Sequence, residues 1–403
     1  MGVLRKTYHA GYGPQCMKAV ILAAGEGTRL EPLTAVRPKP MLPVANKPLL
    51  EYVVEAAAEA GIDEIVIVVG YKRERIQNHF GDGDDWGVDI EYVLQEKQLG
   101  TGHAILQVED VVGDEFVVLN GDLIMGSESV ERLVRRREAT GNTVMSVIRS
   151  RQPSAYGVVE LDGDTVVSVV EKPPEHTQPS NLINAGAYAF DRSIFDAIRE
   201  TDSPGEQAIT DTLSRIAGHG DIEGVRFEGQ WLDVSHLWDL LSVNGRILDH
   251  MAAADHPSVS VHESAVVSDN CVVGPDTYVR ANATVLPGVS LGANVEVGSN
   301  AVVSNSVVFA DATIEPGAVV RDCIVGENAT VGENATVSGG DTDIVVNGNH
   351  YENVRLGGVV GDNADLGGGV TVSPGTVIGN GTTVATGASV SGRIESNATV
   401  RRG

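Results

Sequence analysis

Aliphatic residues recur every six positions along the C-terminal part of the 403-residue chain, and this repeat limits the possible folds more than any other feature. A step of six is even, so successive markers on extended strands face the same side. On an α-helix, six residues turn through about 600°, which scatters the markers over three directions. The glycine and asparagine residues between the markers oppose a helix and suit tight corners. The repeat therefore predicts a parallel β-helix whose stacked coils bury one aliphatic column. The markers are Val261, Val267, Val273, Val279, Val285, Leu291, Val297 and Val303, then Val308, Ile314 and Val320, then Val325, Val331 and Val337, and finally Val360, Leu366, Val372, Ile378, Val384 and Val390.

The repeat begins after a short linker and is interrupted by one longer segment. Residues Asp249–Pro257 have the pattern of a helix end that passes into a linker, so we place the domain boundary near Asp255. Residues 338–358 lack the six-residue spacing and are expected to form a loop that projects from the β-helix. The expected division is an N-terminal extension at 1–16, a first domain at 17–254 and a β-helix domain at 255–403.

The N-terminal half alternates apolar strands with amphipathic helices. Glu64–Val69 is a short, continuous apolar run, which is typical of a strand buried on both faces of a parallel sheet. A helix is expected over Pro48–Ala60, and Ser127 or Ser129 is expected to cap another that runs to about Arg137. This alternation predicts a doubly wound, Rossmann-like α/β sheet that binds ligands at the carboxyl ends of its strands.

One loop of this half has the features of a phosphate site. The apolar run Ala19–Ala24 ends in the glycine turn Gly25–Thr28, and Arg29 and Lys39 follow. Such a turn exposes backbone N–H groups, to which the cations add positive charge. The dinucleotide-binding pattern Gly-x-Gly-x-x-Gly fails because its sixth position is Leu30, and no Gly-x-x-x-x-Gly-Lys-Ser/Thr run occurs. A bare Gly-x-Gly is also common in plain turns, so the phosphate hypothesis depends on the rest of the chain.

Other chemically active side chains also follow predicted strands. Asp122 comes after the run Phe116–Leu119, and Lys172 ends another strand. Asp233 precedes a helix expected from about Ser235 to Met251. Each residue alone has a structural explanation, as a turn former, a solvated charge or a helix N-terminal residue. Together they favour one ligand site at the strand ends.

The formal net charge is −26, and no lysine follows Lys172. An acidic, lysine-poor surface argues against binding to nucleic acid or to anionic membranes. We interpret this composition as adaptation to high salt, in which screening removes self-repulsion. No run of 18 apolar residues occurs, so no membrane-spanning segment is expected.

The three cysteines, Cys16, Cys271 and Cys323, are too few and too scattered for a disulfide framework or a zinc site. Cys271 and Cys323 fall at small-residue positions of the repeat, where packing explains them best. A reducing, cytoplasmic location fits this cysteine usage.

Several motifs together resemble those of the sugar-1-phosphate nucleotidylyltransferases. Leu22–Arg29 and Pro38–Pro43 look like the family's signature, and Gln95–Ala104 resembles the base-reading segment of its glucose- and N-acetylglucosamine-1-phosphate members. The resemblance covers Met17 to about Met251. The further motifs, in the family's order, are Gly121-Asp122, Tyr156-Gly157, Glu171-Lys172-Pro173, Asn184-Ala-Gly186 and Trp231-Leu-Asp233.

The resemblance implies a reaction in which a sugar-1-phosphate attacks the α-phosphorus of a nucleoside triphosphate and pyrophosphate leaves. Such a displacement depends on positioning and charge neutralisation more than on a protein nucleophile. By resemblance, Mg²⁺ is the cofactor and is held by Asp122 and Asp233. The implied catalytic cations are Arg29, Lys39 and Lys172. The implied nucleotide-binding residues are Ala24, Gly25, Glu26, Gly27, Thr28, Gln95, Gly100 and Thr101, and the sugar-binding residues are Gly157, Glu171 and Asn184.

The repeat region resembles the left-handed β-helix that many nucleotidylyltransferases carry, and which in some is an acetyl-CoA-dependent acyltransferase. Those enzymes typically place a catalytic His and a nearby Tyr inside a coil, but the coils from Val267 to Val337 contain no His. His350-Tyr351 falls in the predicted projecting loop, where we expect an exposed His. Acetyl-CoA is therefore expected as a cofactor only if the β-helix has a second activity.

Three functions remain open. The leading hypothesis is a Mg²⁺-dependent transferase that uses UTP or dTTP and glucose-1-phosphate or N-acetylglucosamine-1-phosphate, with a β-helix for oligomerisation. The second is a bifunctional enzyme that also acetylates glucosamine-1-phosphate. The third is a non-catalytic assembly subunit, as in translation-initiation exchange factors, against which the intact set of cations and carboxylates argues. A homo-oligomer is expected, and related β-helix domains often form trimers.

Overall fold

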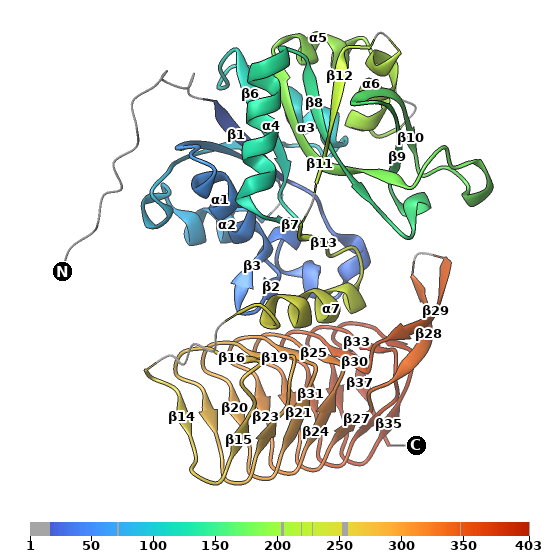
Figure 1. Ribbon diagram of the computed structural model, residues 1–403. Helices are drawn as coiled ribbons and strands as arrows, with labels where there is room; N and C mark the ends of the chain where they lie inside the picture. The colour runs from blue at the N-terminus through green and yellow to red at the C-terminus, as the bar shows by residue number, and fades with distance from the viewer. Residues whose placement is uncertain are drawn as a thin grey trace, which may run out of the picture.

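The computed structural model describes residues 17–70, 72–202, 205–218, 220–227, 229–251, 257–346 and 348–402. An α/β domain lies on one side of a β-helix, with helix α7 (Leu237–Leu248) between the two (Figure 1). The expected extension at 1–16 and the expected boundary near Asp255 both lie outside the described residues. No helix in the described part of the chain is long and apolar enough to cross a membrane.

The α/β domain is built on a nine-stranded sheet of order β5-β4-β1-β6-β11-β8-β12-β10-β9. Strands β5, β4, β1 and β6 are parallel, as expected from apolar runs such as Glu64–Val69. Beyond β6 the sheet is mixed, because β11 runs antiparallel to both β6 and β8. The strands are β1 (Lys18–Ala23), β4 (Glu64–Val69), β5 (Asp89–Leu94), β6 (Glu115–Asn120), β8 (Thr143–Arg149), β9 (Gly157–Asp162), β10 (Thr165–Glu171), β11 (Leu182–Asp191) and β12 (Ile222–Arg226), beside the small pairs β2 (Pro43–Val44) with β3 (Lys47–Pro48) and β7 (Leu123–Met125) with β13 (Trp231–Asp233).

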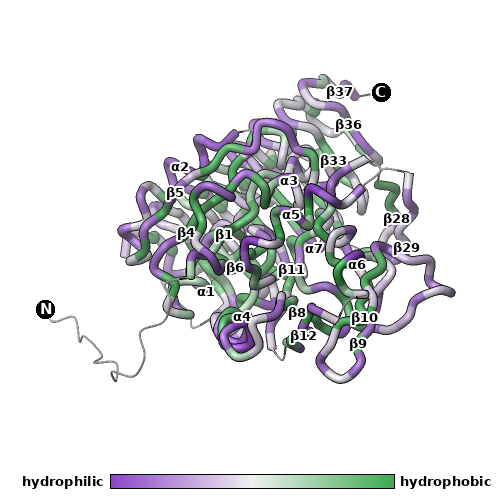
Figure 2. The backbone as a smooth tube through the Cα atoms, turned by 90° about the horizontal axis from the view of Figure 1, so that it is seen from above, coloured by the Kyte–Doolittle hydropathy of each residue, from purple (hydrophilic) through white to green (hydrophobic). Residues whose placement is uncertain are grey.

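Helices cover both faces of this sheet, which confirms the doubly wound arrangement. Alternate residues of β1 point to opposite faces: Ile21 packs with α1, α2 and α4, whereas Val20 packs with α3, α5 and α6. Seen from above, the central strands are largely hydrophobic and the outer helices carry hydrophilic stretches (Figure 2). The helices are α1 (Leu49–Glu59), α2 (Arg73–Phe80), α3 (Thr101–Leu106), α4 (Ser127–Thr140), α5 (Ser193–Arg199) and α6 (Ile209–Ala217).

Two helix boundaries differ from the sequence-based expectation. Helix α4 begins at Ser127 itself, with Gly126 as its N-cap and no capping hydrogen bond from a side chain, so neither serine caps it. It continues past Arg137 to Thr140 because the left-handed Gly141 ends it (φ 68°). Helix α7 is shorter than the expected Ser235–Met251, because the segment before Leu237 is extended and the His236–Asp239 capping box starts the helix.

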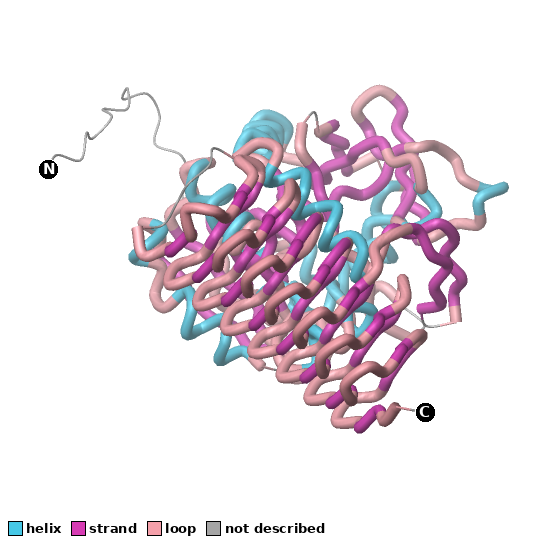
Figure 3. The backbone as a smooth tube through the Cα atoms, turned by 90° about the horizontal axis from the view of Figure 1, so that it is seen from below, coloured by secondary structure: helices cyan, strands magenta, loops and turns pink. Residues whose placement is uncertain are grey.

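The C-terminal half is a left-handed β-helix of three flat sheets, which Figure 3 shows from below. Each marker pairs with the residue one coil later, as Val279 does with Val297 and Val285 with Val303. One coil therefore contains three six-residue repeats, and its aliphatic column is buried. The exceptions are Val261, at 45% exposed, and the half-buried Val267, because both lie in the first coil at the open end of the stack. The sheets are β14-β17-β20-β23-β26-β31-β34-β37, β15-β18-β21-β24-β27-β32-β35 and β16-β19-β22-β25-β30-β33-β36. Their strands are β14 (Ser260–Val261), β15 (Val266–Val267), β16 (Cys271–Val273), β17 (Tyr278–Val279), β18 (Thr284–Val285), β19 (Val289–Leu291), β20 (Glu296–Val297), β21 (Val302–Ser304), β22 (Val307–Val308), β23 (Thr313–Ile314), β24 (Val319–Arg321), β25 (Cys323–Val325), β26 (Thr330–Val331), β27 (Thr336–Val337), β30 (Gly358–Val360), β31 (Asp365–Leu366), β32 (Thr371–Val372), β33 (Thr376–Ile378), β34 (Thr383–Val384), β35 (Ser389–Val390), β36 (Arg393–Ile394) and β37 (Thr399–Val400).

The segment that interrupts the repeat is a β-hairpin of β28 (Asp341–Val346) and β29 (Asn349–Arg355), not an irregular loop. It projects from the β-helix beside the N-terminal end of α7 (Figure 1). His350 is exposed, as expected, but Tyr351 contacts the other domain, with its hydroxyl 3.1 Å from His236 Nε2. The hairpin thus links the β-helix to the start of α7. The first residue of α7, Leu237, follows Asp233, the last residue of β13, by four positions.

Candidate active site

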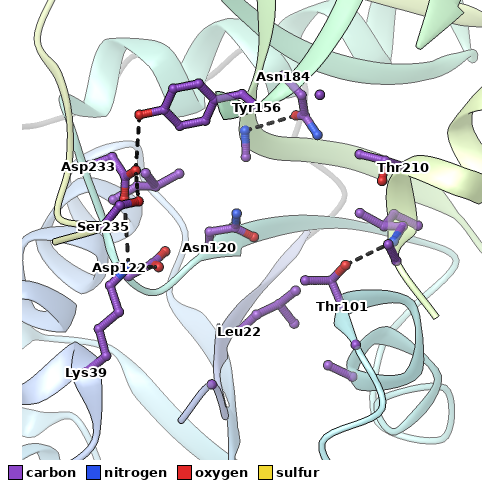
Figure 4. Close-up of a pocket in the computed structure, with 18 of the residues that line it drawn as sticks. Leu22, Lys39, Thr101, Asn120, Asp122, Tyr156, Asn184, Thr210, Asp233 and Ser235 are labelled. Atoms are coloured by element: carbon purple, nitrogen blue, oxygen red, sulfur yellow. Dashed lines mark hydrogen bonds and ion pairs between the residues drawn. The ribbon is translucent and has the colours of Figure 1, made fainter. Parts of the chain in front are cut away.

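A cavity of about 760 Å³ opens at the carboxyl ends of β1 and β6. The structure brings to its lining every site residue that we predicted from the sequence. Figure 4 shows Lys39, Asp122 and Asp233 on one side and Thr101 and Thr210 on the other. The predicted residues on the lining are Ala24, Gly25, Glu26, Gly27, Thr28, Arg29, Lys39, Gln95, Gly100, Thr101, Asp122, Gly157, Glu171, Lys172, Asn184 and Asp233.

The glycine loop is held at both ends by hydrogen bonds. Gln98 Nε2 donates to the Ala24 carbonyl at 2.8 Å, and Thr34 Oγ1 donates to the Gly27 carbonyl at 2.9 Å. Gly27 has a left-handed backbone (φ 68°), and a Cβ there would lie 2.8 Å from Lys39 Cβ. Only glycine allows this close approach, which places the loop against the Lys39 segment.

Two carboxylates meet around the Lys39 ammonium. Lys39 Nζ lies 2.6 Å from Asp122 Oδ2 and 3.8 Å from Asp233 Oδ1. Asp122 lies two residues after the end of β6, whereas Asp233 ends β13, which pairs antiparallel with β7 so that Asp233 is opposite Leu123. This register brings together two carboxylates that lie far apart in the sequence. Ser235 Oγ also donates to Asp233 Oδ2, at 2.6 Å.

Burial and charge oppose one another in this group. Burial raises the pKa of Asp233, and the adjacent Asp122 carboxylate adds to this rise while Lys39 opposes it. Burial disfavours the Lys39 ammonium, but Asp122 and Asp233 outweigh it and raise the Lys39 pKa. The site is therefore one in which two mutually repelling carboxylates favour a cation between them.

The side of the cavity predicted to read the base is a tightly hydrogen-bonded turn. Gln95 is only 4% exposed, and its Nε2 donates to the Gly100 carbonyl at 3.2 Å and lies 2.9 Å from His103 Nδ1. Thr101 Oγ1 accepts a hydrogen bond from the Ile209 amide at 2.9 Å. The Gln95 amide therefore supports the turn at Gly100, and its role in reading a base stays a prediction.

Gly100→Ala should weaken nucleotide binding. Gly100 has φ 106°, and a Cβ there would lie 2.6 Å from the Gln207 carbonyl oxygen, so the turn must move. We expect KM for the nucleotide to rise about tenfold or more, as one or two contacts are misplaced. Steady-state kinetics measure this. Gly245→Ala is the control, because Gly245 is helical and nothing lies near its added Cβ; equal effects of both substitutions would contradict the assignment.

The side predicted to bind the sugar is formed by β9, β10 and β11. Gly157 pairs with Glu171 across β9 and β10, and a Cβ at Gly157 would lie 3.2 Å from Glu171 Oε2. Lys172 has a left-handed backbone (φ 41°), and its Nζ is 3.1 Å from Glu171 Oε1. Asn184 lies within β11, at a bulge, where its Nδ2 donates to the Tyr188 hydroxyl at 2.6 Å.

Several lining residues had no assigned role in the sequence analysis. Asn120 ends β6 immediately before the Gly121-Asp122 motif, and the Tyr156 hydroxyl donates to Asp233 Oδ2 at 3.3 Å. Both were adjacent to motif residues, so position relative to a strand end could have indicated them. Glu206 and Thr210 come from a distant segment and carry no local signal.

A glycine loop after β1, with cations and paired carboxylates in one cavity, is the kind of site that suits phosphorylated ligands in an α/β protein. The family models are more specific, because the nucleotidyl transferase model matches residues 18–250. The chain belongs to the nucleotidyl transferase family, a family of enzymes. A second model, described as the GMPPB C-terminal domain, matches residues 278–400.

Curated relatives match the same part of the chain. The bifunctional protein GlmU of Methanococcus maripaludis strain C7 is 41% identical over 236 residues, 58% of this chain and 55% of its own length. The low-salt glycan biosynthesis nucleotidyltransferase Agl11 of Haloferax volcanii is 38% identical over 58% of this chain and 66% of its own. Glucose-1-phosphate thymidylyltransferase of Streptomyces antibioticus is 37% identical over 58% of this chain and 67% of its own length. The chain thus spans about half the length of the GlmU relatives that it matches.

Two solved structures share the fold of this half. One is assigned as a glucose-1-phosphate thymidylyltransferase from Bacillus anthracis in complex with sucrose, with a TM-score of 0.55 and 27% identity over 59% of this chain and 98% of that one. The other is UDP-glucose pyrophosphorylase complexed with UDP-glucose. It has a TM-score of 0.54 and 27% identity over 58% of this chain and 99% of that one. The matches support the class of site described above.

Proposed function

We propose that the protein transfers a nucleotidyl group from UTP or dTTP to a sugar-1-phosphate, giving a nucleotide sugar and pyrophosphate. The single observation that carries the proposal is the convergence of Lys39, Asp122 and Asp233 beside the glycine loop in one cavity. Glucose-1-phosphate, which the name of the Streptomyces antibioticus relative contains, and N-acetylglucosamine-1-phosphate, which the resemblance of the Gln95–Ala104 segment implies, are the proposed acceptors.

In this proposal the chain positions the substrates and neutralises charge, and supplies no nucleophile. The backbone N–H groups of Gly25–Thr28 and the Arg29 guanidinium hold the triphosphate. Lys39 stabilises the negative charge that develops on the α-phosphate, and Lys172 neutralises the sugar phosphate. Gly157 leaves room for the sugar ring, which Glu171 orients. A phosphate oxygen of the sugar-1-phosphate then attacks the α-phosphorus, and the bond to pyrophosphate breaks.

Asp122 and Asp233 fit the role of Mg²⁺ ligands. Their carboxylates converge in a partly buried site that favours a cation. In the structure the Lys39 ammonium is the positive charge beside both of them. Among the described residues no group of three or more His, Cys, Asp or Glu is placed to hold a metal. Two protein carboxylates with phosphate and water oxygens match the way Mg²⁺ is usually bound beside phosphates. When bound, the ion would withdraw charge from the phosphate oxygens.

The decisive experiment measures pyrophosphate release with each pairing of UTP or dTTP with glucose-1-phosphate or N-acetylglucosamine-1-phosphate, in molar salt with and without Mg²⁺. Rapid release with one pair, dependent on Mg²⁺, is the expected result. Release with no pair would instead support the non-catalytic assembly role. Acetyl transfer has no specific observation in its favour, since His350 lies exposed in the hairpin; acetyl-CoA consumption with glucosamine-1-phosphate would overturn that judgement.

We also propose a cytoplasmic protein adapted to high salt, which predicts salt-dependent stability. With a net charge of −26, self-repulsion is strong when the Debye length is about 30 Å at low salt and weak when it is about 3 Å in molar salt. A loss of several kcal/mol in dilute buffer would lower Tm by about 10 °C. Thermal unfolding in NaCl and in sodium sulfate at equal ionic strength measures this. An unchanged Tm from dilute to molar salt would contradict the proposal.

We propose that the chain forms a homo-oligomer through its β-helix. Two of its three sheets lie away from the α/β domain, and their outward residues include uncharged side chains such as Thr284 and Val302 (Figure 1). Light scattering after gel filtration measures the assembly, and a trimer is the expected state by analogy with related β-helices. A monomer at all concentrations would contradict it.

A further inference from the structure

The segment that carries the catalytic cations lies directly on the β-helix. We call residues 28–41 the cation loop, because Arg29 and Lys39 both belong to it. Its apolar residues Leu30 and Leu33 are fully buried in one cluster with Phe309 and Val359 of the β-helix. The β-helix therefore forms one wall against which the cation loop folds.

Arg37 forms buried ion pairs across this boundary. Its Nη2 lies 2.7 Å from Asp362 Oδ2 and 2.8 Å from Glu327 Oε2, and its guanidinium lies 4.8 Å from the centre of the Phe309 ring. The side chains of Arg37 and Asp362 are only 3% and 2% exposed. Arg75 of the first domain also contacts Glu327, at 3.1 Å.

The acidic partners of Arg37 occupy equivalent corners of successive coils. The Glu327 carbonyl accepts a hydrogen bond from the Asn363 amide, and the Asp362 carbonyl accepts one from the Gly381 amide. In both cases the donor lies one coil later and one position further along the chain. In the coils before Glu327 the same corner, defined by the same hydrogen bond, is formed by Pro275, Ala293 and Ala310. In the coil after Asp362 it is Asn380, whose Nδ2 donates to the Pro32 carbonyl at 3.0 Å. The corner is apolar at Pro275, Ala293 and Ala310, and it is polar in the next three coils, where Glu327, Asp362 and Asn380 contact the cation loop.

The chain between Arg37 and Lys39 is short and stiff. Arg37-Pro38-Lys39-Pro40 contains two prolines, which fix their own φ angles and restrict the residues before them. A shift of the Arg37 backbone is therefore passed to Lys39, whose Nζ must stay within reach of Asp122. Taking Arg37 and Asp362 out of water is costly, and a hydrophobic contact alone would suffice for docking.

We propose that Arg37 is a positioning residue, through which the β-helix corner Glu327–Asp362–Asn380 holds the cation loop in the geometry that binds the nucleotide. The inference rests on the proposed function for its catalytic consequence, but the anchoring itself does not. The β-helix is then part of the nucleotide site, although none of its residues that the structure describes lines the cavity.

The test compares full-length variants with the wild-type chain. Arg37→Met removes the charge and keeps the length, Arg37→Lys restores one ion pair, and Asn380→Asp removes the donor to Pro32 and adds a negative charge at the corner. Arg37→Met/Asp362→Asn is included because Arg37→Met alone leaves a buried carboxylate without a partner and can fail to fold. Arg280→Met is the matched control, since it breaks an Arg–Glu pair of 2.8 Å on the exposed face of the β-helix.

We expect kcat/KM for the nucleotide to fall by about 10²-fold in Arg37→Met/Asp362→Asn, and KM for the sugar-1-phosphate to change less than about twofold. Arg37→Lys should recover part of this loss, and Arg280→Met should match the wild type. Hydrogen exchange should become faster in peptides covering residues 28–41 and stay unchanged in β4. Equal changes in KM for both substrates, or a loss of folded protein alone with normal kinetics, would overturn the proposal.

The two proposals can fail separately. If the wild-type chain releases no pyrophosphate, the proposed function fails, but faster exchange of the cation loop in the Arg37 variants still supports the anchoring. If the wild type is active and the variants exchange and react as it does, the anchoring proposal is wrong and the function stands.

Discussion

Replacing Asp122 by alanine is expected to abolish most turnover while the fold survives. The carboxylate lies at the end of β6, beside Lys39, and its side chain is 31% exposed, so little packing is lost. Loss of one metal ligand removes several kcal/mol of charge stabilisation, which corresponds to a fall in kcat of about 10³-fold. Pyrophosphate release at saturating substrates gives kcat, and circular dichroism follows the fold.

The matched control for this substitution is Asp114→Ala. Asp114 is exposed and lies immediately before the opposite end of the same strand, where β6 begins at Glu115. It should leave kcat and Tm unchanged, since surface substitutions generally alter stability by less than about 0.5 kcal/mol. Near-normal turnover of a folded Asp122→Ala protein would show that Asp122 is not a metal ligand, whatever the behaviour of Asp114.

Lys39→Met is the second substitution with a large expected effect. It removes the ammonium that lies between Asp122 and Asp233 while keeping a side chain of similar length. Loss of one preorganised charge partner of the reacting phosphate should lower kcat/KM for the nucleotide by about 10²–10³-fold. The same loss leaves two carboxylates facing each other without a counter-charge, so added Mg²⁺ should raise Tm more in this variant than in the wild type.

Two measurements check the Lys39 prediction independently. Kinetics give kcat/KM, and thermal unfolding with and without Mg²⁺ gives the metal-dependent stabilisation. Lys18→Met is the control, because Lys18 forms a surface pair with Glu64 at the other end of β1 and should change neither quantity. If Mg²⁺ stabilised Lys39→Met no more than the wild type, the carboxylates would not form the cation site.

The features that were predictable from the sequence are those that depend on residues close to one another along the chain. The six-residue spacing predicts the β-helix because an even step keeps its markers on one side, and the structure buries all of them except Val261 and Val267 in the first coil. The residues after Ala23 and Asn120 collect in one cavity because β1 and β6 are adjacent and parallel, so their carboxyl ends meet.

What escaped prediction depends on contacts between distant segments. Gly126, not a serine, is the N-cap of α4, and no side chain makes a capping hydrogen bond to the first amides of the helix. The bulge at Asn184 arises where β11 pairs with both β8 and β9. The anchoring of Arg37 has no local signal at all, since its carboxylate partners are separated from it by 290 and 325 residues.

That separation also has a consequence in time. At a synthesis rate of about 5–20 residues per second, Asp362 is made roughly 15–65 s after Arg37. The first domain can fold around its cavity during this interval, because β13 completes it by Asp233. If the cation loop needs its corner of the β-helix, the nascent chain holds an assembled cavity that does not yet bind nucleotide well. The protein would then bind nucleotide well only after the coils that contain Asp362 and Asn380 have left the ribosome.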